Sequence, residues 1–334
     1  MANATPGTRP PAQDGRFVNL DGTTPDKKGW AVLYWALRYR LLDELRQGFA
    51  AFLDLFRREK SWRPRFRPNE ADALDPEKPH LTWLGHSTFL LRLGGHWVLT
   101  DPVFGHPAGT LWRHVPPGLP PARLPQIDVV TLSHDHYDHL DLPSLAALKG
   151  EPQIVAPLQL GQYLSRPQSQ VLELDWWQSS ERPGLRITLT PAHHWAMRGL
   201  TSRNRTLWAG FIYEADGITL YFAGDSALQP PVFQAIRERF PRIDIAILPI
   251  GAYAPRWFMQ AQHMDPEEAV LAYKILGARR FVAMHWGTFF LSSEGTREPV
   301  DRLRATWAKQ GHREEDLWIM DVGETRSLLG EPRA

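Results

Sequence analysis

Short apolar runs recur along most of the chain, and they predict strands. Leu81–Leu84, Thr88–Leu93 and Trp97–Thr100 follow one another closely, and the Gly94-Gly95 pair between the last two is typical of a hairpin turn. Runs of similar length predict further strands at Val129–Leu132, Ile154–Ala156, Leu185–Thr190, Trp208–Tyr213, Ile218–Phe222, Ile245–Leu248, Phe281–Met284 and Leu317–Met320.

Helical segments are predicted between and after the later strands. They are Leu142–Leu148, Pro231–Arg239, Pro266–Leu276 and Val300–Lys309, and Asp265 before Pro266 suits a helix cap followed by a first-turn proline. Along the chain, a group of consecutive strands is followed by alternating strands and helices. This order occurs twice, without an obvious sequence repeat. This order predicts an α/β protein with two sheets packed face to face and helices outside.

The N-terminal 79 residues follow a different pattern. Residues 1–28 are rich in Pro, Gly, Asn and Asp, which indicates a disordered or loosely draped arm. From Trp30 to Phe56 the apolar residues recur at helical spacing, which predicts an amphipathic helix that Gly48 could interrupt. We therefore expect an N-terminal region, 1–79, and one large domain, 80–334.

Composition excludes several classes of protein. A content of 43% hydrophobic and 22% charged residues is that of a globular chain, and the net charge of +1 gives no general attraction to nucleic acid. No phosphate-binding glycine motif is present either. Because the chain has no cysteine, it has no disulfide, thiolate ligand or cysteine nucleophile. Neither a secretory signal nor an apolar run near the roughly 20 residues of a membrane span is visible, so we expect a cytoplasmic protein.

Basic residues are concentrated near the N-terminus. Residues 27–67 contain eleven Lys or Arg and four Asp or Glu, a local excess of +7. A basic amphipathic helix can lie on an anionic membrane, where each basic residue contributes about 1 kcal/mol. It can also pack its apolar face against the rest of the protein. The first alternative predicts peripheral association with the inner membrane face, and both remain open.

The segment His134-Asp135-His136-Tyr137-Asp138-His139 carries the strongest chemical signal. It follows a predicted strand directly, where α/β proteins place functional loops. Imidazole nitrogens and carboxylate oxygens are ligands of Zn²⁺ and related divalent ions. The spacing allows some side chains to reach one cation and others a second, so this loop predicts a metal site.

Further potential ligands follow later predicted strands. His193 and His194 follow one strand, Asp225 follows another, and His285 ends a third. Consecutive strand residues face opposite ways, so only one of His193 and His194 is expected to point inward. Four loops that each present a ligand type support a shared metal centre.

These motifs resemble the metallo-β-lactamase-fold hydrolases, and within them the N-acyl-phosphatidylethanolamine-hydrolysing phospholipase D family. The finer resemblance rests on the strings 83–88, 100–104, 191–195, 207–211, 222–225, 248–259, 262–269 and 285–289. It spans about residues 81–290, and the N-terminal region matches only loosely.

The resemblance implies a metallo-β-lactamase αββα four-layer sandwich with an N-terminal amphipathic helical extension. It also implies two zinc ions, although Fe or Mn could use the same ligands. One ion would be held by three nitrogens, the other by a carboxylate and two nitrogens, with a bridging carboxylate. These ligands would be His134, His136 and His194 for the first ion, Asp138, His139 and His285 for the second, and Asp225 as the bridge.

Several other residues are predicted to act at the site. Asp101 would orient a ligand imidazole, or it would only cap a turn. His263, which in the family approaches the substrate phosphate, would act as an acid or oxyanion donor. Arg256 would clamp a phosphate oxygen or face water, and Tyr253, in the same family string, would contact substrate. His86 either serves the site or only braces the loops.

The resemblance implies that the chain is an enzyme with a phospholipid substrate. The expected reaction is phosphodiester hydrolysis of N-acyl-phosphatidylethanolamine to N-acylethanolamine and phosphatidic acid, with Asp138, His263 and Asp101 in the catalytic machinery. A soluble lactonase or another ester or phosphodiester hydrolase of the same fold is the alternative, and a non-catalytic metal-binding protein is a third. Family relatives are often dimers, so a homodimer is also expected.

Overall fold

The computed structural model describes residues 14–25, 64–69, 74–109, 111–199 and 201–329. The helix expected between Trp30 and Phe56, with most of the basic stretch, lies outside them. No helix among the described residues has the length and apolar character needed to cross a membrane.

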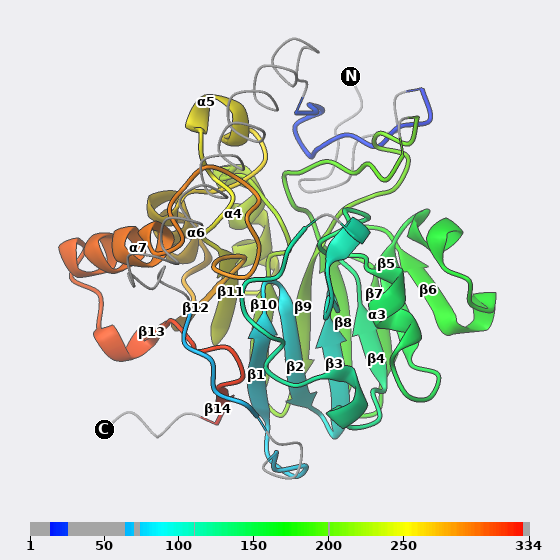
Figure 1. Cartoon of the computed structure of the whole chain (residues 1–334). Coiled ribbons are helices and arrows are strands. Elements are labelled where there is room, and N and C mark those ends of the chain that lie inside the picture. The colour runs from blue at the N-terminus through cyan, green and yellow to red at the C-terminus, as the bar shows by residue number, and fades with distance from the viewer. Residues whose placement is uncertain (1–13, 26–63, 70–73, 110, 200, 330–334) are drawn as a thin grey trace, which may run out of the picture.

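Within this part of the chain, two sheets of seven strands form the centre of the molecule (Figure 1). The first sheet contains, in spatial order, β14 (Thr325–Ser327), β1 (His80–Gly85), β2 (Thr88–Leu93), β3 (His96–Thr100), β4 (Val129–Thr131), β5 (Gln153–Pro157) and β6 (Val171–Leu174). The second contains β13 (Leu317–Trp318), β12 (Arg280–Met284), β11 (Ile245–Pro249), β10 (Ile218–Phe222), β9 (Gly210–Ala215), β8 (Leu185–Thr190) and β7 (Ser179–Arg182).

Each sheet combines antiparallel and parallel pairing. In the first, β1 to β3 form an antiparallel meander, and β3 to β6 are parallel. In the second, β7 to β10 are antiparallel, and β10 to β13 are parallel. The parallel strands bring their carboxyl ends to a common edge, where α/β proteins place their sites.

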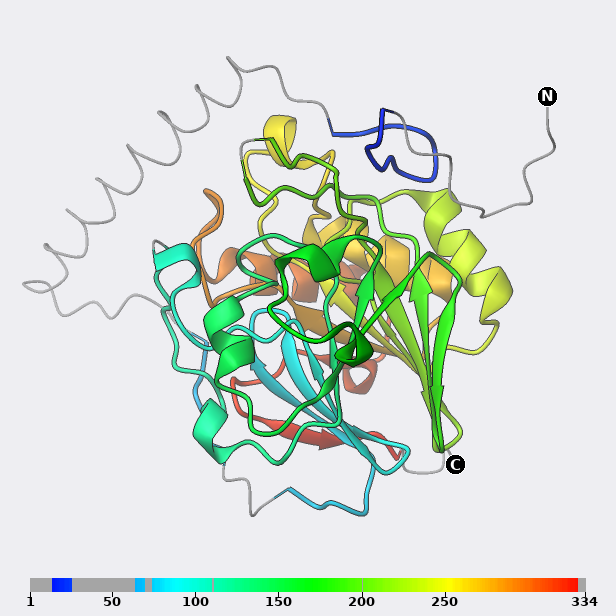
Figure 2. The same ribbon diagram turned by 90° about the vertical axis from the view of Figure 1, so that its right-hand side faces the viewer.

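Helices lie on the outer faces of the two sheets (Figures 1 and 2). They are α3 (Leu142–Ala146) over the first sheet and α4 (Pro230–Arg239), α6 (Pro266–Leu276) and α7 (Glu298–Lys309) over the second. A short helix, α5 (Arg256–Met259), lies in the loop before α6. Short 3₁₀ turns occur at Pro107–Gly109, Pro121–Arg123, Leu160–Tyr163, Gln168–Gln170 and Glu314–Asp316. The predicted αββα sandwich is therefore confirmed.

The strands are apolar on both faces because both faces are covered. In β2, Phe89 and Leu91 belong to the large core between the sheets, whereas Leu90 belongs to a second core beneath α3. Alternate strand residues point to opposite faces, so a doubly covered strand becomes a continuous apolar run. Phe89 meets Phe222 of the opposite sheet, with ring centroids 6.5 Å apart.

Most predicted elements are present with small shifts of their ends. At α6 the expected cap is confirmed, since Asp265 and Glu268 form a reciprocal capping box. The prediction missed β6, β7, β14 and α5. The first three are edge strands, with partly exposed residues that weaken the apolar signal.

The arm expected to be loose is packed over its described part, 14–25. Phe17, Val18 and Asn19 are buried, and Phe17 joins the core between the sheets. The polar composition of residues 1–28 concealed these few anchoring side chains. The boundary between 1–79 and 80–334 stays a prediction.

Candidate metal centre

The potential ligands gather at the edge where the parallel strands of both sheets end. The loop 134–139 follows β4, His194 follows β8, Asp225 follows β10 and His285 follows β12 directly. Residues far apart in the sequence thus meet because each leaves its sheet at the same edge.

His134, His136 and His194 form the first group. Nδ1 of His136 lies 2.9 Å from Nε2 of His134 and 3.3 Å from Nε2 of His194. One ring nitrogen from each residue lies within 4.8 Å of the other two. Three imidazoles packed this closely are a ligand set for a divalent cation.

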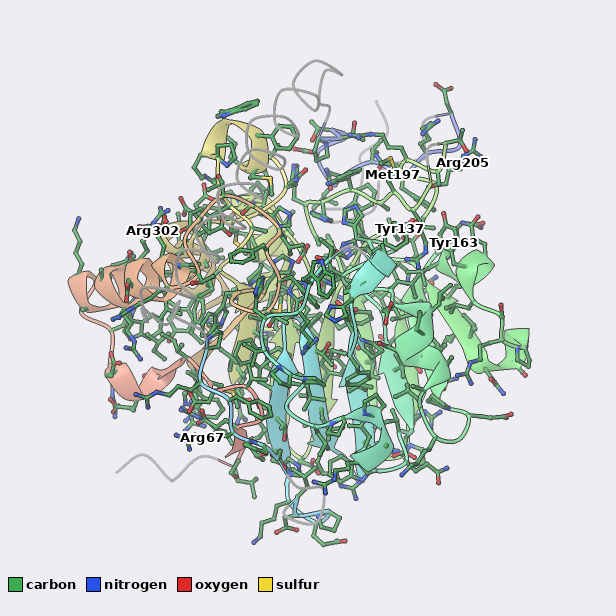
Figure 3. All side chains as sticks on the ribbon, in the orientation of Figure 1. Arg67, Tyr137, Tyr163, Met197, Arg205 and Arg302 are labelled. Atoms are coloured by element: carbon green, nitrogen blue, oxygen red, sulfur yellow. The ribbon has the colours of Figure 1, made fainter. Side chains whose placement is uncertain are left out.

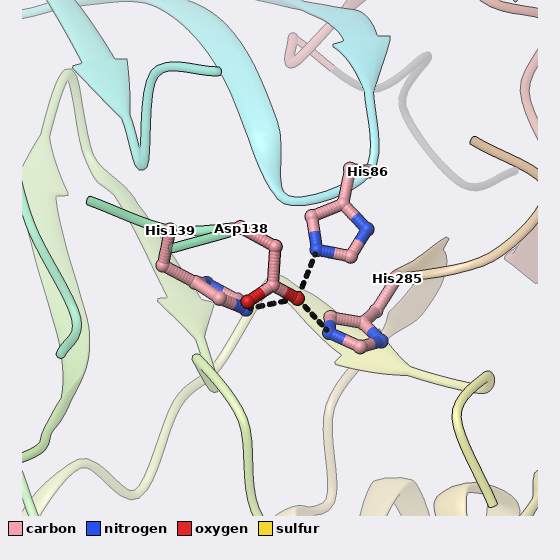
Figure 4. Close-up of side chains that lie close together, drawn as sticks. All are labelled: His86, Asp138, His139 and His285. Atoms are coloured by element: carbon pink, nitrogen blue, oxygen red, sulfur yellow. Dashed lines mark hydrogen bonds and ion pairs between the residues drawn. The ribbon is translucent and has the colours of Figure 1, made fainter. Parts of the chain in front are cut away.

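Asp138, His139 and His285 form the second group, and His86 joins them (Figure 4). Oδ2 of Asp138 lies 3.7 Å from Nε2 of both His139 and His285. It also lies 3.2 Å from Nε2 of His86, which comes from the turn between β1 and β2. The sequence left a site role for His86 open, and the structure brings it into the group.

Asp225 lies between the two groups. Its Oδ1 is 3.1 Å from Nε2 of His285, and its Oδ2 is 3.2 Å from Nε2 of His139. The same Oδ2 lies 3.8 Å from Nε2 of His194 and 4.0 Å from Nε2 of His134. This is the position that a bridging carboxylate requires.

Several buried nitrogen and oxygen atoms of the centre have no hydrogen-bond partner among the described neighbouring side chains, and a metal ion could supply one. Among the described residues, Nε2 of His139, Nε2 of His285 and Oδ1 of Asp225 are buried and lack the alignment of a hydrogen bond. Buried polar atoms without partners are costly, and a cation in their midst would satisfy all three.

Hydrogen bonds behind the ligands select which ring nitrogen faces the centre. Nδ1 of His139 donates to Oδ2 of Asp101 at 2.8 Å, and Nδ1 of His194 donates to the carbonyl of Gln262 at 2.9 Å. Asp101 also accepts from the N–H and the hydroxyl of Ser133. Such contacts direct each Nε2 lone pair toward a metal, and Asp101 occupies the place expected of an orienting carboxylate.

Burial keeps several of these imidazoles neutral. It lowers the pKa of His134 and His194 well below the usual value. Burial, together with the neighbouring His285, lowers the pKa of His86 to about 3. A neutral ring has a free lone pair, so these residues are in the form that binds metal.

The carboxylates have the opposite effect on the remaining imidazoles. Burial by itself would lower the pKa of His285, but Asp225 and Asp138 raise it to about 9. The pKa of His139 is likewise raised well above its usual value, against burial, by the same carboxylates. The charge that retains a proton on these rings is the charge that would attract a cation.

Unusual backbone conformations support the centre. His86, Asp101 and His285 all have positive φ values, of 54°, 34° and 61°. Non-glycine residues rarely adopt such values, and they cluster at functional sites. Gly251 allows the close approach of the turn at His285, because a Cβ there would lie 2.1 Å from the His285 carbonyl oxygen.

A pocket of about 490 Å³ opens over the centre. Metal-group residues and His263 line its base, and Nδ1 of His263 lies 3.8 Å from Oδ2 of Asp225. Tyr137 and Met197 also line the pocket. Figure 3 labels both in the upper part of the view and Arg67 in the lower part, so the pocket opens at the upper end of the molecule. Its apolar lining consists of Pro25, Leu111, Trp195, Met197, Ala252, Phe258, Met259 and Leu291.

Two predicted substrate contacts find no geometric support among the described residues. Tyr253 is buried, donates to Glu298 and does not line the pocket. Arg256 pairs with Glu268 at 2.8 Å and donates to the carbonyl of His263. The arginine therefore contacts the backbone of a pocket residue, and neutralises acidic residues at the start of α6.

Of the neighbouring histidines, His193 faces the N-terminal arm, with Nδ1 3.9 Å from Asp21, and His194 enters the centre, as the sequence analysis expected of one of the two.

The structure also shows a pocket residue that the sequence did not reveal. Arg203 lines the pocket, and its guanidinium lies 4.8 Å from the Trp195 ring centroid. No motif spacing marks Arg203, since it stands in a loop rich in turn residues.

Comparison with known proteins agrees with this geometry. Residues 96–286 match the family described as the β-lactamase superfamily domain. The chain is 36% identical over 263 residues to N-acyl-phosphatidylethanolamine-hydrolyzing phospholipase D 1 of Caenorhabditis elegans, covering 73% of this chain and 74% of that protein. It is 34% identical over 257 residues to the mitochondrial N-acyl-phosphatidylethanolamine-hydrolyzing phospholipase D of Saccharomyces cerevisiae, covering 73% and 55%.

Among solved structures, a metallo hydrolase from Ignicoccus hospitalis matches with a TM-score of 0.56 and 24% identity. The match covers 75% of this chain and 97% of that one. At this identity the likeness shows the fold alone.

Replacing His86 with alanine tests its membership of the second group. The variant removes the hydrogen bond to Asp138, and we expect the affinity for a metal ion at this group to fall about 10- to 100-fold. Competition with a chelator, followed by elemental analysis, measures this. His193→Gln is the matched control. An unchanged affinity in a folded His86→Ala protein would exclude His86 from the centre.

Metal binding should release protons. Because the pKa of His285 is raised to about 9, its ring is protonated at neutral pH in the metal-free protein, and a metal must displace that proton. Affinity should therefore increase as the pH rises toward about 9. Calorimetry near neutral pH, in buffers of different ionisation enthalpy, measures the release, and a heat independent of the buffer would contradict it.

Proposed function

Because the chain belongs to the N-acyl-phosphatidylethanolamine-hydrolysing phospholipase D family of the β-lactamase superfamily, and is thus a metal-dependent hydrolase, we propose that it cleaves N-acylated aminophospholipids. Water attacks phosphorus, and the P–O bond to the N-acylethanolamine breaks. The departing oxygen takes a proton, and the other product is phosphatidic acid.

The apolar pocket directly above the ligand groups is the observation that carries this proposal. The pocket has ionisable residues at its base and apolar residues along its walls. A substrate with a phosphodiester and a hydrocarbon part matches this arrangement, with the phosphodiester at the base and the hydrocarbon against the walls. Its volume of about 490 Å³ lies within the range of small-molecule sites. Phe258 and Met259 of α5, together with Leu291, supply one apolar side of the pocket.

We propose zinc as the resident metal, two ions per chain, although other divalent ions suit the same ligands. When bound, such a pair lowers the pKa of a water to roughly 7 and neutralises charge on phosphate oxygens. His134, His136 and His194 would hold one ion and Asp138, His139 and His285 the other, with Asp225 shared. Asp101 holds His139 in the ring orientation that this requires.

His263 and Arg203 are the residues proposed to act on the substrate. His263 lines the base of the pocket beside Asp225, where an imidazole can donate a proton to the departing oxygen. Arg203 is the one arginine among the described lining residues, so it offers a positive charge to a phosphodiester in the same pocket.

A membrane surface is the proposed source of the substrate. Trp112 and Trp257 are 70% and 46% exposed, and each adjoins a pocket-lining residue in sequence, Leu111 and Phe258. Tryptophan is favoured at membrane–water interfaces. The basic stretch 27–67 would add attraction to anionic lipid, although most of it lies outside the described residues. Homodimer formation stays a prediction.

Hydrolysis assays on purified, metal-loaded protein test the substrate. We expect N-acylethanolamine and phosphatidic acid from vesicles that contain N-acyl-phosphatidylethanolamine, detected by mass spectrometry, and Asp225→Asn should reduce both to background. A generic phosphodiester and a lactone serve as comparison substrates. Turnover of the lactone alone would replace the phospholipase assignment with the lactonase alternative.

Replacing both exposed tryptophans tests the membrane surface. Trp112→Ser combined with Trp257→Ser should weaken binding to phospholipid vesicles at least about tenfold, because two apolar side chains are lost from the interface. Hydrolysis of a dispersed short-chain substrate should change little. Leu271→Ser, at a position on α6 that is 42% exposed, is the control. Equal vesicle binding by all three proteins would place the docking surface elsewhere.

A further inference from the structure

We propose that Asn19 is a positioning residue for the metal centre, although it lies 175 residues before the ligand that it positions. Its side-chain Oδ1 accepts a hydrogen bond from the backbone N–H of His194 at 3.0 Å. The same oxygen accepts from Nε1 of Trp208 at 3.0 Å. Asn19 is fully buried, so water does not compete for these bonds.

The two donors determine which way the Asn19 amide points. The N–H of His194 and the indole N–H of Trp208, which also donates to the Ala192 carbonyl at 3.0 Å, both face this side chain. The side-chain NH₂ group is only a donor, so the oxygen must face them. Among the described residues, Nδ2 of Asn19 makes no hydrogen bond. The two hydrogen bonds of the Asn19 side chain are therefore both accepted by its Oδ1.

The backbone around Asn19 keeps the side chain directed inward. Its N–H donates to the Thr23 carbonyl, and its carbonyl accepts from Gly22, each at 2.8 Å, which closes a tight turn. The N–H of Phe17 donates at 2.8 Å to the carbonyl of Asn204, in the loop that follows His194. These contacts fasten the segment on both sides of Asn19.

Asn19 supplies one of several attachments of the loop that carries His194. On the opposite side, the N–H of His193 donates to the Ser226 hydroxyl, and the N–H of Ala227 donates to the His193 carbonyl. The His194 ring is oriented separately, by the Gln262 carbonyl. Asn19 thus fixes the main chain of His194, while Gln262 fixes the direction of its ring.

A shift of this main chain would move Nε2 of His194 away from His134 and His136. The second group would keep its geometry, because His139 and His285 come from other loops. The inference rests on the proposed role of His194 as a ligand, and it predicts that Asn19 affects the two bound ions unequally.

Cobalt titration of the metal-free full-length chain tests this role without measuring catalysis. Co²⁺ absorbance follows the binding of each ion. Asn19→Leu keeps a similar volume but removes the acceptor, and we expect one of the two affinities to fall about 10- to 100-fold while the other stays within about twofold. Asn19→Asp keeps acceptor oxygens, and it should restore most of the lost affinity.

Phe17→Ala, which weakens the packing of the same segment without removing a hydrogen bond to His194, is the matched control. It should leave both affinities near those of the unchanged chain. Circular dichroism and thermal unfolding verify that each variant is folded. If Asn19→Leu does not fold, the comparison of Asn19→Asp with Asn19→Ser, whose shorter side chain cannot reach both donors, takes its place.

Three outcomes would overturn the proposal: unchanged cobalt affinities in a folded Asn19→Leu protein, an equal loss at both ions, or the same selective loss in Phe17→Ala. The proposed function fails by a different result. A chain that binds two cobalt ions, loses one selectively in Asn19→Leu and does not cleave the lipid would lack the proposed substrate, while the role of Asn19 would stand.

Discussion

The candidate centre is organised around one buried carboxylate, Asp225, that lies between two groups of imidazoles. Asp225 lies within 3.1–4.0 Å of ring nitrogens from His134, His139, His194 and His285. Rings and carboxylates held this closely, away from water, leave polar atoms that lack well-aligned partners. Such an arrangement is costly by itself, and positive ions among the ligands would make it favourable.

The fold provides this arrangement by ending strands of two sheets at one edge. Each sheet is rigid because it is covered on both faces, so the turns that leave it have little freedom. The positive φ values of His86, Asp101 and His285 show that the turns are bent to aim side chains at the centre. The pocket above them is apolar, and this combination of a charged base with hydrocarbon walls suits an amphiphilic phosphodiester.

Much of this could be predicted from the sequence. The doubly covered strands are apolar runs, and the crowded ligands of the 134–139 loop are a local pattern, so both are visible without a structure. Asn19 and His86 act through contacts with residues that are distant along the chain, and no spacing rule marks them. Tyr253 and Arg256, which the family string suggested as substrate contacts, bond Glu298 and Glu268 and do not line the pocket. Their contact with substrate stays a prediction.

Anomalous diffraction from crystals of the metal-loaded protein tests the shared carboxylate most directly. The account predicts two peaks about 3.5–4 Å apart, one against His134, His136 and His194, the other against Asp138, His139 and His285, with Asp225 in contact with both. A single peak, or two peaks of which Asp225 touches only one, would contradict it.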